Sequence, residues 1–227
     1  KGLFKSQKIK FISAKNMEKD FYEIRLEKPE DLRWAPGEHG IFSLPNTKIK
    51  GKKWRAFSIA STAKEDVILL GTRTGETPSS FKKTFINLKA GDEVKIRGPF
   101  GWFKIRDQES PLVFVALGVG ITPIRSILMS LKHAHHRTIH IIYSSKDFYL
   151  FKDEIQEIIE HNEHFSVHYI DSKENTVQMV KNASSKFKND AYYYIAGSND
   201  AIKNVRITLG ENGIKKSRMI NDPFLGY

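Results

Sequence analysis

The chain has 227 residues, of which 40% are hydrophobic, so it can bury a core as one large domain or two small ones. It contains no cysteine, which excludes disulfides, iron-sulfur clusters, thiolate metal sites and cysteine nucleophiles, so any redox chemistry needs another bound cofactor. The formal net charge of +11 favours an anionic partner, but the lysines are dispersed among acidic residues, which makes nucleic acid the weakest candidate.

The apolar segments are too short to cross a bilayer. The longest, residues 112–124, is interrupted by glycines and a proline, whereas a spanning helix needs about 20 apolar residues. We therefore expect no transmembrane segment in this chain and a cytoplasmic location. The chain begins at Lys1 rather than at methionine, which leaves open a signal, a membrane segment or a further domain upstream.

Histidine is the most plausible metal ligand in a chain without cysteine. His133, His135 and His136 cluster at the end of a predicted helix. A solvated or helix-capping role is favoured there over metal binding, so we expect no metal site.

The first part of the chain shows short, alternating or β-rich runs separated by turn-prone segments. These runs predict strands at residues 9–13, 21–26, 40–44, 54–59, 67–70 and 94–96. Many short strands at this spacing indicate an antiparallel β-barrel or sandwich, which we place at residues 1–106.

The rhythm changes in the second part, which we place at residues 107–227 after a polar boundary at 106–110. Apolar strand-like runs at 112–117, 138–143, 165–169 and 192–196 alternate with helical stretches near 123–133, 152–160, 176–187 and 200–212. This alternation predicts an α/β domain with a parallel sheet.

A glycine turn follows the first strand of this second domain. Gly118 and Gly120 precede Thr122, which we predict to cap a helix, and Pro123, which suits its first position. Glycines let the backbone approach a pyrophosphate, and the exposed amides of the helix start favour its negative charge. Because the full Gly-x-Gly-x-x-Gly fingerprint is absent, ordinary turn chemistry is the alternative interpretation.

Five landmarks together resemble one family. Trp54-Arg-Ala-Phe-Ser-Ile-Ala-Ser resembles the Arg-x-Tyr-Ser flavin motif of ferredoxin-NADP reductases, and Arg97-Gly-Pro-Phe-Gly-Trp-Phe resembles the segment that closes their barrel. Gly118-Val-Gly-Ile-Thr-Pro, Ile195-Ala-Gly-Ser and a carboxyl-terminal Tyr227 follow in family order. The chain therefore resembles the ferredoxin-NADP reductase superfamily over nearly its whole length, which implies a flavin-binding β-barrel domain followed by an NAD(P)-binding α/β domain.

The resemblance assigns flavin contacts to the first motif. Arg55 is expected to neutralise a flavin phosphate, Ala56 and Phe57 to lie along the flavin, and the Ser58 hydroxyl to reach N5, where hydride arrives. Phe57 replaces the commoner tyrosine and loses its hydroxyl. The alternative is an amphipathic strand with Phe57 in the core and Arg55 in a surface pair.

A second segment, residues 71–81, is similar to the family's other phosphate-contacting stretch. It implies that Thr72, Arg73, Ser79 and Ser80 hold the flavin phosphates, with a short helix that opens at residues 78–80. A capped surface helix is the alternative interpretation. The sequence that follows departs from the family pattern, so FMN stays possible beside FAD, which we favour.

The carboxyl-terminal landmarks concern the nicotinamide. Tyr227 is expected to cover the flavin face and to move aside when nicotinamide binds, although a frayed terminus is the alternative. Gly197 and Ser198 are expected to contact the dinucleotide together with the glycine turn. Ala196 stands where many relatives carry cysteine, which indicates looser alignment of the nicotinamide and slower turnover.

The preference between nucleotides depends on the end of the second predicted α/β strand. Ser144, Ser145 and Lys146 are placed to hold an adenosine 2′-phosphate, and Asp147 lies too far along to claim a 2′-hydroxyl. We expect NADPH to be favoured slightly over NADH.

The function that these features imply is an NAD(P)H-dependent flavin oxidoreductase. Hydride passes from NAD(P)H to FAD, with Ser58 and Tyr227 as the catalytic residues, and electrons then leave to an external acceptor. Ferredoxin, flavodoxin or a small molecule are the candidate acceptors, and the basic charge suits an acidic carrier protein. The alternative is a non-catalytic flavin-binding subunit that transfers electrons within a larger complex.

Overall fold

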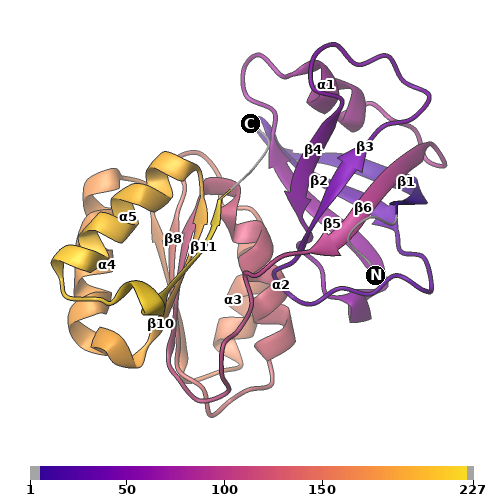
Figure 1. Cartoon of the computed structure of the whole chain (residues 1–227). Helices are drawn as coiled ribbons and strands as arrows, with labels where there is room; N and C mark the ends of the chain where they lie inside the picture. Colours follow the sequence, from indigo (N-terminus) through magenta and orange to yellow (C-terminus); the bar gives the residue numbers. More distant parts are fainter. Residues whose placement is uncertain (1–5, 224–227) are drawn as a thin grey trace. The chain divides into compact units, whose positions relative to one another are not determined.

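The computed structural model describes residues 6–223. Contacts between Cα atoms divide the chain into two units, of which the first ends at Lys104 and the second begins at Ile105 (Figure 1). Each unit has its own hydrophobic core.

The first unit is a six-stranded antiparallel sheet in the order β4-β3-β6-β1-β2-β5. Its strands are β1 (Ser6–Glu18), β2 (Phe21–Glu27), β3 (His39–Ser43), β4 (Trp54–Ser58), β5 (Val67–Arg73) and β6 (Glu93–Phe100). The two end strands, β4 and β5, also contact one another, so the sheet curls into a barrel-like form. The predicted antiparallel barrel is confirmed.

Alternation along the strands explains why this sheet has an inside and an outside. In β6, Val94 and Ile96 are fully buried, whereas Lys95 and Arg97 between and after them are exposed. Helix α1 (Ser80–Ile86) adds two fully buried rings, Phe81 and Phe85, to the same core. The helix is therefore fixed against the barrel by its own apolar face.

The second unit is a five-stranded parallel sheet in the order β11-β10-β7-β8-β9. Its strands are β7 (Leu112–Leu117), β8 (Ile139–Ser144), β9 (Phe165–Ile170), β10 (Tyr192–Gly197) and β11 (Met219–Pro223). Its helices are α2 (Ile121–Leu131), α3 (Lys152–Glu160), α4 (Lys173–Phe187) and α5 (Asn199–Glu211). The predicted parallel α/β sheet is confirmed.

Helices cover both faces of this sheet. In Figure 1, α2 and α3 lie on one face, and α4 and α5 lie on the other. A central strand must then be apolar on both sides, and residues 112–116 of β7 are all fully buried. This double burial is why β7 reads in the sequence as a continuous apolar run.

The strand order defines where a ligand can enter the second unit. From β7 the chain moves to β8 and β9 on one side, and then returns to β10 and β11 on the other. The direction of winding reverses between β7 and β10, and in open α/β sheets ligands bind at the carboxyl edge beside such a reversal. Gly118 and Gly197 stand at the carboxyl ends of these strands.

Strand β11 was not predicted from the sequence. Its residues, Met219-Ile-Asn-Asp-Pro, include types that are depleted in strands, yet it pairs in parallel with β10 at the edge of the sheet. An edge position tolerates such residues because one side of the strand makes no ladder bonds.

The polar boundary at residues 106–110 is held to the second unit by hydrogen bonds. The buried Arg137 side chain donates to the carbonyl oxygens of Asp107 and Ser110 at 2.7 and 3.0 Å, and to the Asp107 carboxylate at 2.9 Å. The Arg106 amide donates to the Tyr194 hydroxyl at 3.0 Å. The segment is therefore an anchored start of the second unit rather than a loose linker.

Candidate functional site

Strand β4 carries the first motif. Arg55 is 8% exposed, and its Nη1 donates to the carbonyl oxygens of Lys52 and Trp54, both at 2.9 Å. Its guanidinium lies 5.3 Å from the centre of the Phe81 ring on α1. Burial lowers the pKa of Arg55 below its ordinary value.

Phe57 lies on the same face of β4, two residues further along. It is 7% exposed and belongs to the barrel core, with ring centres 5.8 Å from those of Phe42 and Phe85 and 6.3 Å from that of Phe81. The structure therefore gives Phe57 a packing role in the core. The contact of Phe57 with a flavin stays a prediction, and only the small exposed part of the ring could make it.

Ser58 ends β4 and faces the opposite side of the strand from Phe57. It is 5% exposed and stands directly across from His39 of β3. Cross-strand partners share one face of a sheet, so this histidine lies beside the serine. Burial lowers the pKa of His39, and the charge of Glu38 opposes that shift. His39 was not singled out from the sequence.

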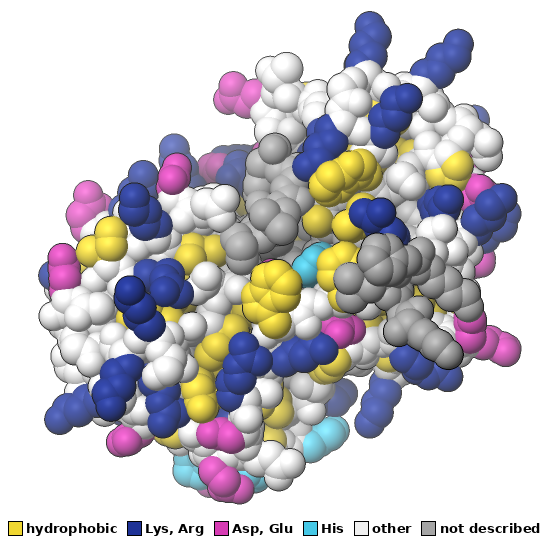
Figure 2. Space-filling model, in the orientation of Figure 1, with side chains coloured by type: hydrophobic (Ala, Val, Ile, Leu, Met, Phe, Trp, Pro, Cys, Tyr) yellow, Lys and Arg dark blue, Asp and Glu magenta, His cyan; other side chains and the backbone are white. Residues whose placement is uncertain are grey.

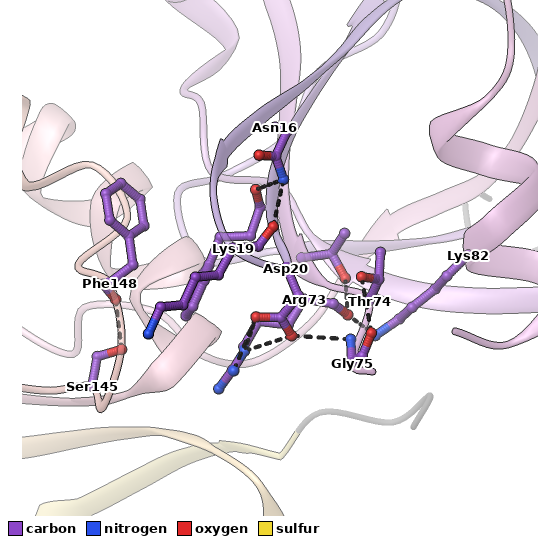
Figure 3. A network of polar contacts seen from close by, with 11 residues as sticks. Asn16, Lys19, Asp20, Arg73, Thr74, Gly75, Lys82, Ser145 and Phe148 are labelled. Carbon is purple, nitrogen blue, oxygen red and sulfur yellow. Dashed lines mark hydrogen bonds and ion pairs between the residues drawn. The ribbon is translucent and has the colours of Figure 1, made fainter. Parts of the chain in front are cut away.

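Arg73 ends β5 and is held by the turn between β1 and β2. Its Nε and Nη2 donate to both oxygens of Asp20, at 3.0 to 3.2 Å, and the Gly75 amide donates to the same carboxylate at 3.0 Å (Figure 3). Burial raises the pKa of Asp20, but the bonds and the charge of Arg73 outweigh it, so this pKa lies below its ordinary value. The guanidinium also lies 4.5 Å from the centre of the Phe21 ring.

Lys82 of α1 reaches this cluster from the other side. Its side chain is 9% exposed, and Nζ donates to the Arg73 carbonyl oxygen at 2.6 Å (Figure 3). Burial lowers the pKa of Lys82 from 10.5 to about 8; the charge of Arg55 adds to the shift, Asp20 opposes it and Arg73 adds to it. Three basic side chains from β4, β5 and α1 thus act on one another electrostatically.

The helix that carries Lys82 begins as the sequence predicts. Ser79 is the N-cap of α1, and its hydroxyl accepts the Lys82 amide at 3.3 Å. The Ser80 hydroxyl accepts the Lys50 amide at 3.0 Å. Thr72 is 3% exposed within β5. Both serines therefore stabilise local structure, and their contact with a phosphate stays a prediction.

The glycine turn of the second unit has little room for side chains at two of its three glycine positions. Gly118 has φ of +62°, and a Cβ built there meets no atom within 4 Å in the described part of the chain. A Cβ on Gly120 would lie 2.0 Å from the carbonyl oxygen of Ala196, and one on Gly197 would lie 2.7 Å from the Leu117 Cβ. The ends of β7 and β10 therefore touch through glycine, while Gly118 faces open space.

The sequence predicts that Thr122 caps α2 and that Pro123 opens it. This prediction is wrong. A 3-10 turn at Gly118–Gly120 runs directly into α2, which begins at Ile121. Thr122 is 1% exposed, and its hydroxyl donates to the Val119 carbonyl oxygen at 2.9 Å. Glycines bend tightly enough to start the helix two residues early, and Pro123 is tolerated because the first amides of a helix have no partner within it.

Ser198 follows Gly197 and caps α5, where its hydroxyl accepts the Ala201 amide at 3.3 Å. At the end of β8, the Ser144 hydroxyl accepts a bond from Thr176 at 2.9 Å. The Ser145 hydroxyl donates to the Phe148 carbonyl oxygen at 2.6 Å, whereas Lys146 is exposed. Tyr227 lies outside the described residues.

The chain is similar to known proteins in both sequence and structure. Residues 110–217 match the family model described as "Ferric reductase NAD binding domain". The ferredoxin-NADP reductase of Neisseria gonorrhoeae, solved with FAD and NADP, superposes with a TM-score of 0.77 at 18% identity, over 96% of this chain and 98% of that one. The Plasmodium falciparum ferredoxin-NADP reductase superposes with a TM-score of 0.81 at 18% identity, over 96% of both chains.

This chain has the ferredoxin-NADP reductase fold, and its second unit resembles the ferric reductase NAD-binding domain. The predicted resemblance is confirmed. The chain is 32% identical over 153 residues to a subunit of the Na(+)-translocating NADH-quinone reductase from Pseudoalteromonas haloplanktis, and 34% identical over 105 residues to the same subunit from Shewanella putrefaciens. These matches cover 62% and 43% of this chain but 50% and 35% of the relatives, so it spans half or less of their length.

Within this oxidoreductase fold, the structure adds residues that the sequence did not reveal. Asp20 meets Arg73 from 53 positions away and Lys82 meets it from nine positions away, and the sequence reading singled out neither partner. Of residues 6–223, none form a group of three or more side chains that could hold a metal ion. Within the same range, no helix is both long and apolar enough to span a membrane.

Proposed function

We propose that the first unit binds FAD, that the second unit binds NAD(P)H, and that the chain is an NAD(P)H-dependent flavin oxidoreductase. The observation that carries the proposal is the cluster of Arg55, Arg73 and Lys82. Among the described residues whose charge acts on Lys82, Asp20 alone is acidic. Partly buried cations in excess over carboxylates are unfavourable without an anion, and the pyrophosphate of FAD supplies two negative charges.

The cluster of Arg55, Arg73 and Lys82 suits the FAD pyrophosphate in its positive charge and in the number of its hydrogen-bond donors. Arg55 is buried at the start of the motif strand, and Lys82 brings an ammonium with three donor hydrogens, which the Arg73 carbonyl oxygen orients. FAD is preferred to FMN in this proposal because cations from three separate elements suit two linked phosphates. The solved Neisseria gonorrhoeae reductase contains both FAD and NADP, which supports the same pair of ligands for this chain.

In this proposal each unit orients its own ligand. A bound flavin takes a hydride from reduced nicotinamide and passes electrons on to an acceptor. Ser58, which is 5% exposed, would orient the flavin through its hydroxyl. Gly118 lets the backbone approach the dinucleotide pyrophosphate because its Cβ position is open.

The nucleotide preference rests on fewer residues than the sequence indicates. The hydroxyls of Ser144 and Ser145 are both engaged in hydrogen bonds within the fold. Lys146 is exposed and remains the candidate for a 2′-phosphate. Because two relatives are NADH-quinone reductase subunits, we propose that NADH and NADPH both serve as donors.

The acceptor is proposed to be an acidic electron-carrier protein or a small molecule. The net charge is +11, and Figure 2 shows Lys and Arg side chains spread over the face that it presents. A second candidate function follows from the names of the relatives, which are subunits. In that case the chain passes electrons to a partner chain in a larger complex.

The test combines flavin binding with turnover. We expect FAD-reconstituted protein to oxidise NADH and NADPH with ferricyanide as acceptor, and Ser58→Ala to slow flavin reduction by about 10–100-fold. Ser13→Ala on β1 is the matched control and should leave the rate unchanged. If Ser58→Ala reduces flavin at the wild-type rate, the placement of Ser58 at N5 is wrong.

A further inference from the structure

A row of cross-strand partners runs over four strands of the first unit. Ser43 of β3 stands directly across from Trp54 of β4 and, on its other side, from Lys95 of β6. Lys95 in turn stands across from Lys8 of β1. Cross-strand partners share one face of a sheet, and neighbouring strands lie about 4.8 Å apart, so the row crosses about 14 Å of that face.

This face points away from the barrel core. In β6, Val94 and Ile96 are fully buried, whereas Lys95 between them is exposed. In β4, Arg55 is 8% exposed, whereas its neighbour Trp54 is 40% exposed. Successive residues of a strand point to opposite sides, so the row lies on the other side of β4 from Arg55. The face is therefore separate from the cluster that we assign to the flavin phosphates.

The charge on this face is almost entirely of one sign. Across β3, β4, β6 and residues 6–10 of β1, all of them described, Glu93 is the only acidic residue. In Figure 2, Lys and Arg side chains surround exposed hydrophobic ones on the side of the first unit where Figure 1 shows β3, β4 and β6. The exposed residues that we call the basic face are Lys8, Lys10, Lys52, Trp54, Lys95 and Arg97.

The arrangement of these charges is unfavourable by itself. Lys8 and Lys95 are direct cross-strand partners, and like charges in that position destabilise a sheet. Among the described residues, Lys8 alone of the five cations forms an ion pair, with Glu93 at 3.3 Å. Its side chain is 72% exposed, and such surface pairs contribute little. The basic face is therefore suited to an anionic partner.

Trp54 adds an apolar ring to the charged side chains. The Lys52 ammonium lies 3.8 Å from the centre of this ring. Tryptophan combines a large apolar surface with a polar N–H, and it is enriched where lipid meets water. Lysine has a long apolar stem that lets its ammonium reach the polar layer there. Both residue types thus suit the interfacial layer of a bilayer.

Other anionic partners fit the basic face less well. Four of its five cations are lysines, and lysine is depleted at protein–protein interfaces. Single-stranded nucleic acid stacks its bases on aromatic rings, but Lys52 already lies over the Trp54 ring. A layer of anionic headgroups requires only charge of one sign on an accessible surface.

We propose that the basic face binds an anionic lipid surface, with its cations at the headgroups and Trp54 in the interfacial layer. Each basic residue near such a surface strengthens binding by about fivefold, and added salt screens the attraction. The inference goes beyond the proposed function, because it assigns a partner to residues that belong to neither the flavin site nor the nucleotide site.

The experiment is co-sedimentation of the whole chain with lipid vesicles. The vesicles are phosphatidylcholine alone or phosphatidylcholine with about 30% phosphatidylserine, in about 0.05 M and about 0.5 M salt. We expect wild type to bind the anionic vesicles at low salt and to leave them at high salt. The triple variant Lys8→Gln, Lys95→Gln, Arg97→Gln should bind them at least about tenfold more weakly.

Matched controls separate this face from the overall charge. The triple variant Lys173→Gln, Lys181→Gln, Lys203→Gln removes the same net charge from exposed positions of α4 and α5, and it should stay within about twofold of wild type. Trp54→Ala should weaken binding by about threefold or more. Trp102→Ala removes a ring that is 64% exposed in the same unit but outside the basic face, and it should leave binding unchanged.

The outcomes decide the proposal independently of the reductase activity. Equal vesicle binding by wild type and the basic-face variant, or equal losses in the two triple variants, would overturn it. Wild type that binds neither kind of vesicle at low salt would overturn it as well. A single-stranded oligonucleotide that binds more tightly than the vesicles through the same three residues would assign the face to nucleic acid instead.

Two further measurements check that the variants differ from wild type only at this surface. Thermal melts should show that each variant is folded. FAD affinity should be the same in the basic-face variant and wild type, because Arg55 lies on the other side of β4. A loss of FAD affinity in parallel with vesicle binding would contradict the separation of the two sites.

Discussion

The two units offer different means of holding an anionic phosphate, which is the ligand group that we propose for both. The first unit uses side-chain charge, since Arg55, Arg73 and Lys82 converge from separate elements. The second unit uses backbone shape, since Gly118 faces open space and Gly120 lets the ends of β7 and β10 touch. A site made of charges responds to pH and salt, whereas a site made of backbone responds to a single added methyl group.

The difference between side-chain charge and backbone shape also determines how each region affects the stability of the fold. Gathering cations disfavours the folded state, and the lowered pKa of Lys82 indicates such a cost in the first unit. A glycine turn instead costs conformational entropy, which the packed strands around it offset. Variants that change one property at a time can therefore test each half of the comparison.

The largest effect is expected from Gly120→Ala. A Cβ at this position would lie 2.0 Å from the Ala196 carbonyl oxygen and 2.4 Å from its carbon, and both are backbone atoms that cannot turn aside. We expect the free energy of unfolding of the second unit to fall by about 4 kcal/mol or more, measured by urea denaturation.

Gly118→Ala is the matched comparison, because its Cβ meets no described atom within 4 Å and only its φ of +62° is unfavourable. This variant should lose about 1 kcal/mol of unfolding free energy. Equal losses in the two variants would contradict the view that β7 and β10 approach through Gly120.

A smaller effect, of opposite sign, is expected from Lys82→Met in the apoprotein. The pKa of Lys82 is about 8 in the folded chain, against 10.5 ordinarily, so the buried charge destabilises the fold fully below pH 8 and ceases to do so as pH rises toward 10.5. Lys82→Met should therefore raise the unfolding free energy by about 1–3 kcal/mol at pH 7.

The measurement is urea denaturation without flavin, and the pH series supplies a second check. Wild-type stability should rise between pH 8 and 10.5 through this lysine, and the rise should vanish in Lys82→Met. Lys83→Met, which changes an exposed neighbour, should stay within about 0.5 kcal/mol of wild type. A Lys82→Met protein less stable than wild type would show that the cluster stabilises the empty fold.

The smallest effect is expected at a helix cap. Ser198→Ala removes the hydroxyl that accepts the Ala201 amide, and Ser172→Ala removes the one that accepts the Asn175 amide at the start of α4. Each should cost about 1 kcal/mol of unfolding free energy. Nucleotide affinity, measured by calorimetry, should fall in Ser198→Ala alone, and equal affinities would limit Ser198 to capping.

The parts of the fold that could be predicted are those determined by a few consecutive residues. The continuous apolar run of β7 and the glycines after it follow from burial on both faces and from a tight turn, and both are visible in a few residues. The N-cap of α1 at Ser79 was predictable for the same reason. In contrast, β11 forms because β10 offers a ladder to pair with, which outweighs the low strand propensity of Asn and Asp.

The candidate site divides in the same way. Motif residues such as Arg55 and Ser58 share one strand, so their spacing already places them on its two faces. The partnership of Asp20 with Arg73 joins residues 53 positions apart, and Lys82 bonds the Arg73 carbonyl oxygen from helix α1. Such partners are determined by the closure of the sheet and leave no local signal in the sequence.

The central claim is that this chain passes electrons from a nicotinamide to a bound flavin. Its most direct test is the visible absorbance spectrum of the FAD-reconstituted protein, recorded before and after anaerobic addition of NADPH and then NADH. We predict flavin bands that bleach with one or both nucleotides. Bands that persist with both would contradict hydride transfer and favour a role in electron transfer within a larger complex. A protein that retains neither FAD nor FMN would contradict the flavin site itself.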